Sequence, residues 1–336
     1  SADKVDEIPK RGWIPVTVPG AVKGWKALSE RFGSLPFKKL LEPAIDYARN
    51  GYPASAEIAR MWKKALNAIP NSEEFKSWYD TFTFDGKTPE PGQMICMPKL
   101  ADALEKIADT NTDALYYGEL ADRIDEESKR FGGFLRKQDL EDHKVEWVNP
   151  IHVDYHGYQV WELPPNGQGI VALMALNVLN NFQFKDRDVD CIHTQMEALK
   201  MAFADAKEYV TDPKCMNMPV DDLISVDYGK QRASQIGHLA LPPRVDKPHG
   251  SGTVYLCTAD KDGNMVSYIQ SNYMGFGSGI VVDGVSLQNR GYDFSLDPSH
   301  VNYLMPHKKT YHTIIPGFLT KDDKPVGPFG VMGGYM

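Results

Sequence analysis

The first two thirds of the chain are dominated by apolar residues spaced three and four positions apart. This spacing places apolar side chains on one face of an α-helix, and several of these segments end in Gly. Amphipathic helices are therefore predicted at residues 21–33, 40–51, 99–108, 119–133 and 193–210. A further segment, residues 169–179, is apolar on all sides and is predicted to be a helix buried in the core.

From residue 253 onward, apolar and polar residues alternate, which is the period of a β-strand with one buried face. Residues 253–259 and 265–271 flank an Asp-Gly turn and are predicted to form a hairpin. Strand patterns also occur at residues 151–165, 279–282, 285–289, 313–319 and 326–332. Helices first and strands afterwards predict an α+β fold in which helices cover an antiparallel sheet.

One loop, residues 240–252, is dense in Pro, Gly and charged residues and connects the two parts of the chain. It ends in Gly-Ser-Gly and leads directly into Thr253, the first residue of a predicted strand. Most threonines in such a place serve only to form the strand. If the chain were cut before Thr253, however, this residue would carry both a hydroxyl nucleophile and a free α-amine. The reference pKa of such an amine, about 7.7 to 8.0, suits a general base.

Composition and charge exclude several classes of protein. The 336 residues are 42% hydrophobic and carry a formal net charge of −8, as expected of a well-packed acidic domain. Without a long run of Lys and Arg, such a chain is not predicted to bind nucleic acid. The apolar segment 169–179 is too short to cross a bilayer, so no membrane span is predicted.

Metal sites and cofactors have little support in the sequence. The cysteines, Cys96, Cys191, Cys215 and Cys257, have neither CxxC nor Cys/His spacing, which argues against a metal site and leaves disulfide pairing open. Asp260 and Asp262 resemble part of a calcium loop, but the closing Glu is absent, so an exposed hairpin turn is predicted. No metal and no cofactor are therefore expected.

The ends of the sequence suggest a longer protein. The chain has no initiator Met and no visible signal peptide, and it stops abruptly after residues 329–336. We therefore expect it to be incomplete at both ends. Any targeting segment would lie upstream of residue 1, so localisation stays open between the cytoplasm and secretion.

Several separate motifs together resemble the γ-glutamyltranspeptidase family of N-terminal nucleophile hydrolases. They include TVYLCTADKDGN from Thr253, LQNRGYDFSLDP at 287–298 and FGVMGGYM at 329–336. Upstream, VTVPGAVKGW at 16–25 and ELPPNGQG at 162–169 match in the same order. The resemblance spans nearly the whole chain. It implies an αββα sandwich, in which helices cover two stacked antiparallel sheets.

This family is made as a precursor that cuts itself before a threonine. The matching bond here is Gly252–Thr253. Residues 1–252 would then be the mostly helical large-subunit portion, and residues 253–336 the strand-rich small-subunit portion, which together form one domain. The resemblance implies that Thr253 is the nucleophile and, through its new α-amine, its own base.

Three more residues receive catalytic roles from the resemblance. Ser271 would form a hydrogen bond with the Thr253 hydroxyl group and orient it. Gly333 and Gly334 match the glycine pair whose backbone N–H groups form the oxyanion hole. Glycine suits that role because a side chain would block the approach of the donors to the developing negative charge. Without the family resemblance, a structural turn would be the simpler interpretation of this pair.

The expected substrate pocket departs from the family pattern. Transpeptidases hold a zwitterionic glutamyl group with polar residues, and the matching positions here are Tyr273, Arg290, Lys308 and Lys309, with only Asp293 retained. An arginine and two lysines favour a carboxylate over an ammonium group, although surface solvation explains the lysines equally well. Asp293 could still hold an amine, or Arg290 could neutralise it. The pattern is more similar to the glutaryl or cephalosporin acylase-like branch of the family.

Three functions are consistent with these features. The first is a self-processing amide hydrolase or acyltransferase that forms an acyl-enzyme on Thr253 and acts on γ-glutamyl compounds such as glutathione. The second is a cephalosporin or glutaryl acylase with a pocket that reads a carboxylate. The third is a catalytically silent protein that binds acidic ligands. The expected partners are a small-molecule or peptide amide substrate and the two subunits of one precursor, which could pair as a homodimer.

Overall fold

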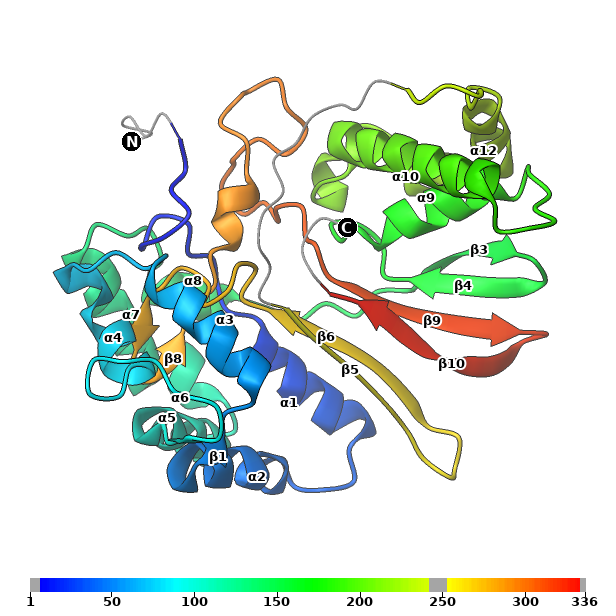
Figure 1. The fold of residues 1–336 in the computed structure, drawn as a ribbon. Helices are drawn as coiled ribbons and strands as arrows, with labels where there is room; N and C mark the ends of the chain where they lie inside the picture. Colours follow the sequence, from blue (N-terminus) through cyan, green and yellow to red (C-terminus); the bar gives the residue numbers. More distant parts are fainter. Residues whose placement is uncertain (1–6, 242–252, 333–336) are drawn as a thin grey trace. The chain divides into compact units, whose positions relative to one another are not determined.

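We describe residues 7–241 and 253–332 in a computed structural model of the 336-residue chain (Figure 1). These residues belong to two compact units. We call residues 147–241, 253–271 and 293–332 the sheet unit, and residues 7–146 together with 272–292 the helical unit. The division between the units follows contacts in space and does not fall at residue 252. The expected boundary there separates subunits rather than compact units, and it stays a prediction.

Short amphipathic helices build most of the helical unit. They are α1 (Ala21–Phe32), α2 (Phe37–Asn50), α3 (Ala56–Leu66), α4 (Lys76–Phe82), α5 (Pro98–Asp109), α6 (Asp113–Tyr116), α7 (Glu119–Arg130) and α8 (Lys137–Asp142), with the 3-10 turn η1 (Glu73–Phe75). Two-residue strands, β1 (Tyr52–Pro53) and β2 (Met94–Ile95), pair between them. The apolar faces of the helices meet in one core around Trp13, Trp62 and Trp78.

The segment 272–292 follows the strand β6 in sequence but packs into the core of the helical unit. It contains the short pair β7 (Val281–Val282) and β8 (Val285–Ser286) and begins the 3-10 helix η3 (Arg290–Asp293). The ring centroid of Phe276 lies 5.5 Å from that of Trp62 and 5.2 Å from that of Trp78. Burial of aromatic rings at such distances anchors the segment to the helices.

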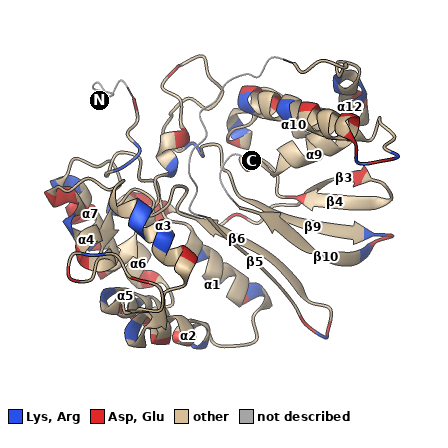
Figure 2. Cartoon of the chain, in the orientation of Figure 1, with Lys and Arg blue, Asp and Glu red and all other residues tan. Residues whose placement is uncertain are grey.

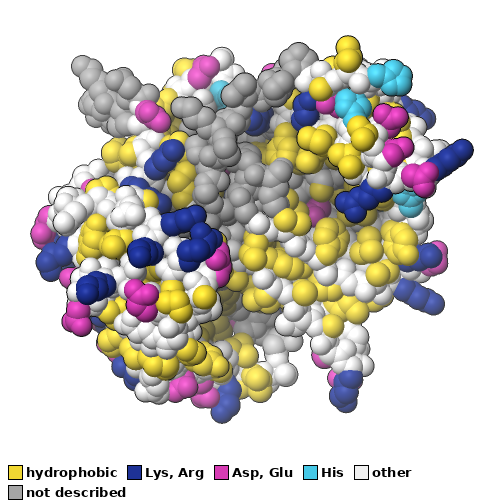
Figure 3. Space-filling view, viewed as in Figure 1, with side chains coloured by type: hydrophobic (Ala, Val, Ile, Leu, Met, Phe, Trp, Pro, Cys, Tyr) yellow, Lys and Arg dark blue, Asp and Glu magenta, His cyan; other side chains and the backbone are white. Residues whose placement is uncertain are grey.

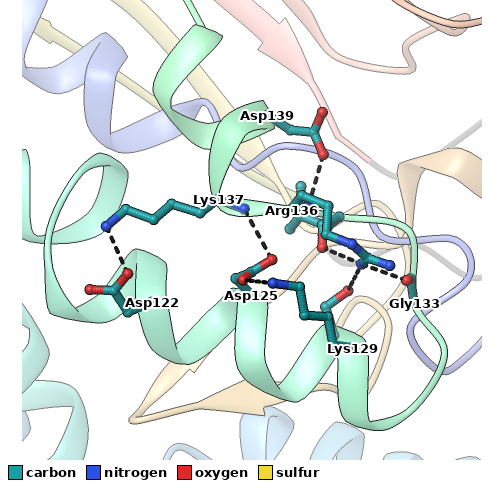
Figure 4. Close-up of polar contacts among 9 residues, drawn as sticks. Asp122, Asp125, Lys129, Gly133, Arg136, Lys137 and Asp139 are labelled. Atoms are coloured by element: carbon teal, nitrogen blue, oxygen red, sulfur yellow. Dashed lines mark hydrogen bonds and ion pairs between the residues drawn. The ribbon is translucent and has the colours of Figure 1, made fainter.

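Polar contacts fix the turn between α7 and α8 (Figure 4). Lys137 donates from Nζ to Asp122 at 2.7 Å and from its backbone N–H to Asp125 at 3.3 Å. The Arg136 side chain donates to the carbonyl oxygen of Gly133 at 2.7 Å. Exposed ion pairs contribute little to stability, so these contacts mainly set the geometry of the turn.

The sheet unit is built on four antiparallel strands in the order β10-β9-β4-β3 (Figure 1). They are β3 (Ile151–Tyr155), β4 (Tyr158–Glu162), β9 (Ile315–Lys321) and β10 (Lys324–Val331). The buried helix α9 (Gly169–Leu179) packs on β3 and β4 through Leu173, which meets Val153 and Val160. The long helix α10 (Val189–Tyr209) packs on α9, and η2 (Pro213–Cys215), α11 (Val220–Leu223) and α12 (Val226–Ala233) follow it.

A hairpin of two seven-residue strands, β5 (Thr253–Ala259) and β6 (Met265–Ser271), packs against β9 and β10. The Ser267 hydroxyl donates to the carbonyl oxygen of Gly317 in β9 at 2.8 Å. In β10, a Cβ on Gly330 would lie 2.3 Å from the ring of Tyr255, so only glycine leaves room for this ring. The hairpin therefore lies in close contact with the backbone of the larger sheet.

The sequence predicted the long elements well and the short ones poorly. All six predicted helices correspond to α1, α2, α5, α7, α9 and α10, and the hairpin 253–259/265–271 is confirmed residue by residue. The strand patterns at 279–282 and 285–289 yield only the two-residue strands β7 and β8. Helices α3, α4, α6, α8, α11 and α12 were missed. The sequence of α3 is amphipathic, but only Ala59 and Trp62 are buried in this helix.

Candidate active site

Thr253 and Ser271 lie directly opposite each other at the open end of the hairpin. The distance between Thr253 Oγ1 and Ser271 Oγ is 2.7 Å, and either hydroxyl group can be the donor. Both side chains are half-buried. The hydrogen bond that the family resemblance implied is therefore present. The catalytic roles of the two residues stay predictions, because the geometry shows proximity and not turnover.

The register of the hairpin explains why these hydroxyl groups meet. Successive side chains of a strand point to opposite faces, so Thr253 shares a face of β5 with Tyr255. On the paired strand, Ser271 shares that face with Ser267. The Tyr255 hydroxyl lies 3.1 Å from Ser267 Oγ, which donates in turn to β9. Val254, on the other face, is 57% exposed. Thr253 thus stands on the hairpin face that packs against the larger sheet.

The two strands of the hairpin contain no charged residue, and the charges lie at its turn (Figure 2). Asp260 accepts hydrogen bonds from the backbone N–H groups of Asp262 and Asn264, as expected of a tight hairpin turn. The strands on which Thr253 and Ser271 lie therefore contribute no charge of their own to the surroundings of these residues.

Gly252, on the predicted cleavage bond, and the predicted oxyanion residues Gly333 and Gly334 lie outside the described residues. Their roles stay predictions.

Tyr273 and Arg290 form a second pair, in the helical unit. Both side chains are 2% exposed, and the Arg290 guanidinium carbon lies 4.1 Å from the centroid of the Tyr273 ring. Stacking of a guanidinium on an aromatic face is favourable, and more so when both groups are desolvated. Tyr273 has a φ angle of +73°, a left-handed conformation that is rare for a bulky residue. The two positions singled out for substrate recognition therefore contact each other.

The backbone around Tyr273 is held by a residue that the sequence analysis did not select. Arg11 donates from Nη1 to the carbonyl oxygen of Gly275 at 2.7 Å and to that of Gly277. The next residue, Gly12, donates its backbone N–H to the carbonyl oxygen of Ser278 at 2.9 Å. Burial lowers the pKa of Arg11. No sequence pattern marks Arg11, because its contacts are more than 260 positions away in the chain.

The remaining predicted binding residues belong to the sheet unit, and their contacts there are structural. Lys308 donates from Nζ to the carbonyl oxygens of Val301, at 2.5 Å, and Tyr303, at 3.1 Å. The exposed Lys309 donates its backbone N–H to Asp212 at 2.9 Å. Lys308 therefore fixes the loop before β9, which favours the structural interpretation of this lysine over substrate binding.

Asn302 organises the same loop and was also missed. Its side chain is 4% exposed and donates to the carbonyl oxygen of Asp293 at 2.8 Å and to Thr310 Oγ1 at 3.0 Å. Its amide oxygen accepts from Thr211 Oγ1 at 2.8 Å. A buried amide with this many partners specifies one loop conformation. Asp293 is thus held through its backbone by a neighbour nine positions away.

The PPNGQG motif forms the loop that leads into α9. Asn166 donates to the carbonyl oxygen of Thr310 at 2.7 Å, and the backbone N–H of Gln168 donates to the carbonyl oxygen of His312 at 2.7 Å. Tyr311 donates from its hydroxyl to Gln168 Oε1 at 3.4 Å, and burial raises the pKa of this tyrosine well above its ordinary value. The motif therefore ties α9 to the segment before β9.

Two hollows are formed by described residues of a single unit. In the sheet unit, apolar side chains gather on the face over β4 and β9 (Figure 3), where Pro150, Trp161, Leu163, Pro316 and Phe318 line a hollow of about 310 Å³. In the helical unit, charged side chains that include Glu74, Arg123 and Arg130 line a hollow of about 230 Å³. Neither hollow is lined by Thr253.

The described residues contain no cluster of three or more potential metal ligands among His, Cys, Asp and Glu. Cys96, Cys191, Cys215 and Cys257 are free in the described residues. Within the described parts of the chain, no helix has both the length and the apolar character that crossing a membrane requires.

Known proteins are similar to this chain over most of its length. The family model of gamma-glutamyltranspeptidase matches residues 1–336. The glutathione hydrolase-like YwrD proenzyme of Bacillus subtilis is 40% identical over 333 residues, which are 97% of this chain and 63% of that protein. The oxamate amidohydrolase proenzyme of Klebsiella pneumoniae is 32% identical over 338 residues, with coverages of 97% and 63%.

Among solved structures, the crystal structure of a cephalosporin acylase from Bacillus halodurans matches with a TM-score of 0.94 and 50% identity. The match covers 99% of this chain and 62% of that one. The predicted fold class, with helices covering stacked antiparallel sheets as in N-terminal nucleophile hydrolases, is thereby confirmed. The chain spans less than two thirds of the length of these relatives.

Proposed function

This chain belongs to the γ-glutamyltranspeptidase family, and we propose that it is part of a self-processing amide hydrolase that forms an acyl-enzyme on Thr253. The observation that carries this proposal is the 2.7 Å contact between the hydroxyl oxygens of Thr253 and Ser271. A hydroxyl nucleophile needs a partner that orients it and a base that takes its proton. Ser271 supplies the first, and cleavage of the preceding peptide bond supplies the second.

Self-processing would begin with attack of the Thr253 hydroxyl oxygen on the carbonyl carbon of Gly252. The C–N bond breaks, an ester forms, and the α-amine of Thr253 is released. Water then hydrolyses the ester and leaves a carboxylate on Gly252. Residues 1–252 and 253–336 would thus become portions of two subunits. The names of the two proenzyme relatives support a precursor of this kind. Pairing of two processed precursors into a homodimer remains a separate proposal.

Turnover would repeat the same chemistry on a substrate amide. The α-amine takes the proton of the Thr253 hydroxyl group, whose oxygen attacks the substrate carbonyl carbon. The backbone N–H groups of Gly333 and Gly334 would bind the oxyanion, a contribution typically worth about 10²- to 10³-fold in rate for each donor. The amine then protonates the leaving group. Water completes hydrolysis of the acyl-enzyme, and an acceptor amine would complete transfer instead.

We propose a substrate whose acyl part carries a carboxylate. Glutathione and oxamate, which appear in the names of the two proenzyme relatives, both contain a carboxylate. γ-Glutamyl compounds such as glutathione are the first candidates. The alternative, a glutaryl or cephalosporin acylase, is favoured by the buried Arg290, which stands where transpeptidases have a neutral ligand, and by the likeness to a cephalosporin acylase. The sequence analysis assigned recognition of the acyl group to Tyr273, Arg290 and Asp293, and each of these assignments is part of the proposal.

The test is a comparison of γ-glutamyl and glutaryl anilides as substrates of the purified protein after complete self-cleavage. Thr253→Ala is the control, because it keeps the fold and removes the nucleophile. Faster turnover of the glutaryl substrate would favour the acylase, and faster turnover of the γ-glutamyl substrate the glutathione hydrolase. If the cleaved protein turns over neither, the catalytically silent alternative, a protein that binds acidic ligands, replaces both.

A further inference from the structure

The carboxyl group of Glu162 is buried at the end of β4 and takes no part in the chemistry proposed above. The residue is 1% exposed, and neither carboxyl oxygen has a hydrogen-bond partner among the described residues. Two glycines make room for it. A Cβ on Gly169 would lie 2.6 Å from Glu162 Oε2, and a Cβ on Gly317 would lie 2.8 Å from Oε1. The carboxyl group is therefore enclosed between the start of α9 and the backbone of β9.

The surroundings of this carboxyl group favour its protonated form. From β9 and β10 it meets Gly317 and Phe329, which cannot ionise, and from β5 the titratable neighbour is Tyr255, whose own pKa is raised mainly by burial. Among the described residues, no Lys or Arg forms an ion pair with Glu162. Burial raises its pKa to about 8. The first turn of α9, which begins at Gly169, attracts a negative charge but donates no hydrogen bond to it.

Gly317 connects Glu162 to the strands of the proposed active site. Its carbonyl oxygen accepts the hydrogen bond from Ser267, which also contacts the Tyr255 hydroxyl group. Tyr255 is two positions from Thr253 on the same face of β5. On the other side, Gly317 pairs with Phe329 of β10. A shift of β9 would therefore move the hairpin that begins at Thr253.

We propose that Glu162 is a positioning residue that keeps β9 and β10 correctly placed against the nucleophile hairpin only while its carboxyl group is protonated. The inference rests on the proposed role of Thr253. An ionised carboxylate without partners is far more costly to bury than a neutral carboxyl group, so it must gain water or a donor. Movement away from Gly169 and Gly317 would supply either, and this movement would disturb the contact between Gly317 and Ser267.

The consequence is a loss of activity at alkaline pH. In the native state Glu162 binds its proton more tightly than in the unfolded chain, where its pKa is near 4.5. Its contribution to stability is therefore fully present at low pH and is lost as the pH rises through about 8. The α-amine of Thr253 has the opposite pH dependence. Activity rises with pH as this amine loses its proton, because only the neutral amine can act as a base. The two groups together predict a narrow bell-shaped pH profile.

The experiment is a measurement of kcat/KM from pH 6 to pH 10 for the self-cleaved wild-type protein and for Glu162→Gln. Glutamine has nearly the same shape and stays neutral throughout this range. The wild type should lose about tenfold in kcat/KM for each pH unit above a midpoint near 8. Glu162→Gln should keep its activity within about twofold up to pH 10, with an unchanged acid limb. Glu208→Gln, at an exposed site on α10, should retain the wild-type profile.

Self-cleavage and melting temperature at pH 7 show whether Glu162→Gln folds, and Glu162→Met is a second neutral variant if it does not. An alkaline limb that survives in the folded neutral variant would overturn the proposal for Glu162 and leave the function of Thr253 intact. A cleaved wild-type protein without turnover at any pH would refute the proposed function, and this inference with it.

Discussion

The hairpin β5–β6 and the segment 272–292 follow each other in the chain but are built in opposite ways. In the hairpin, Thr253 and Ser271 are 18 positions apart, and regular strand pairing brings them together. In the segment, Tyr273 has a left-handed backbone, and Arg11 holds the turn that follows from 264 and 266 positions away. The first region therefore forms from local contacts, whereas the second depends on the rest of the helical unit.

This difference matches the two functions that we propose, which are catalysis for the hairpin and recognition of the acyl group for the segment 272–292. The shared chemistry of the family needs a hydroxyl group at the start of a strand and a second hydroxyl group opposite, which any regular hairpin can supply. Recognition of one acyl group needs side chains at irregular positions, and strained backbone of this kind persists only where surrounding contacts enforce it. The chemistry and the specificity can then change independently.

The substitution Arg11→Met is expected to have the largest effect, because it removes the side chain that holds the segment 272–292. This effect is on the stability of the helical unit. The variant leaves the carbonyl oxygens of Gly275 and Gly277 without their charged donor. Since a hydrogen bond to a charged group contributes about 1.5 to 3 kcal/mol, the free energy of unfolding of the helical unit should fall by about 3 kcal/mol. Urea unfolding measures this change. Self-cleavage at Thr253 should persist, because its partner Ser271 belongs to the other unit.

Arg49→Met is the matched control for this change. Arg49 belongs to the same unit but forms exposed ion pairs with Asp102 and Glu105. Its loss should leave the free energy of unfolding nearly unchanged, because exposed ion pairs contribute little to stability. Equal losses for the two variants would show that Arg11 is no special anchor for the segment.

A smaller effect, on specificity alone, is expected from Arg290→Gln. If Arg290 reads a carboxylate, the change should lower kcat/KM for a glutaryl substrate by about ten- to a hundredfold, which corresponds to about 1.5 to 3 kcal/mol. The γ-glutamyl substrate should improve relative to it. Lys63→Gln, at an exposed site on α3, serves as the control. Equal slowing of both substrates would make Arg290 a structural partner of Tyr273.

The sequence was most informative where structure is local. The period of two after Thr253 and the Asp-Gly turn predicted the hairpin, and the family motif predicted the contact with Ser271. It also singled out both members of the Tyr273–Arg290 pair, but not their mutual contact. That contact depends on a left-handed tyrosine, which no propensity predicts.

The sequence also did not reveal residues whose contacts lie far away along the chain, because no local pattern marks such contacts. Arg11 and Asn302 hold loops through carbonyl oxygens, and a backbone carbonyl carries no sequence signature. Glu162 lies in a motif that had been noticed, ELPPNGQG, but its burial depends on Gly317 in a strand more than 150 positions away. The family resemblance placed Lys308 at a substrate-binding position, whereas its contacts with Val301 and Tyr303 favour a structural role.

The most direct test of the account is self-cleavage at Gly252–Thr253. Denaturing electrophoresis and N-terminal sequencing of the purified wild-type protein should reveal a new chain that begins TVYLCTAD. Thr253→Ala should remain a single uncut chain, because it lacks the hydroxyl group that attacks the Gly252 carbonyl. An intact wild-type chain after long incubation, or a Thr253→Ala variant cut at the same bond, would contradict the assignment of Thr253 as the nucleophile.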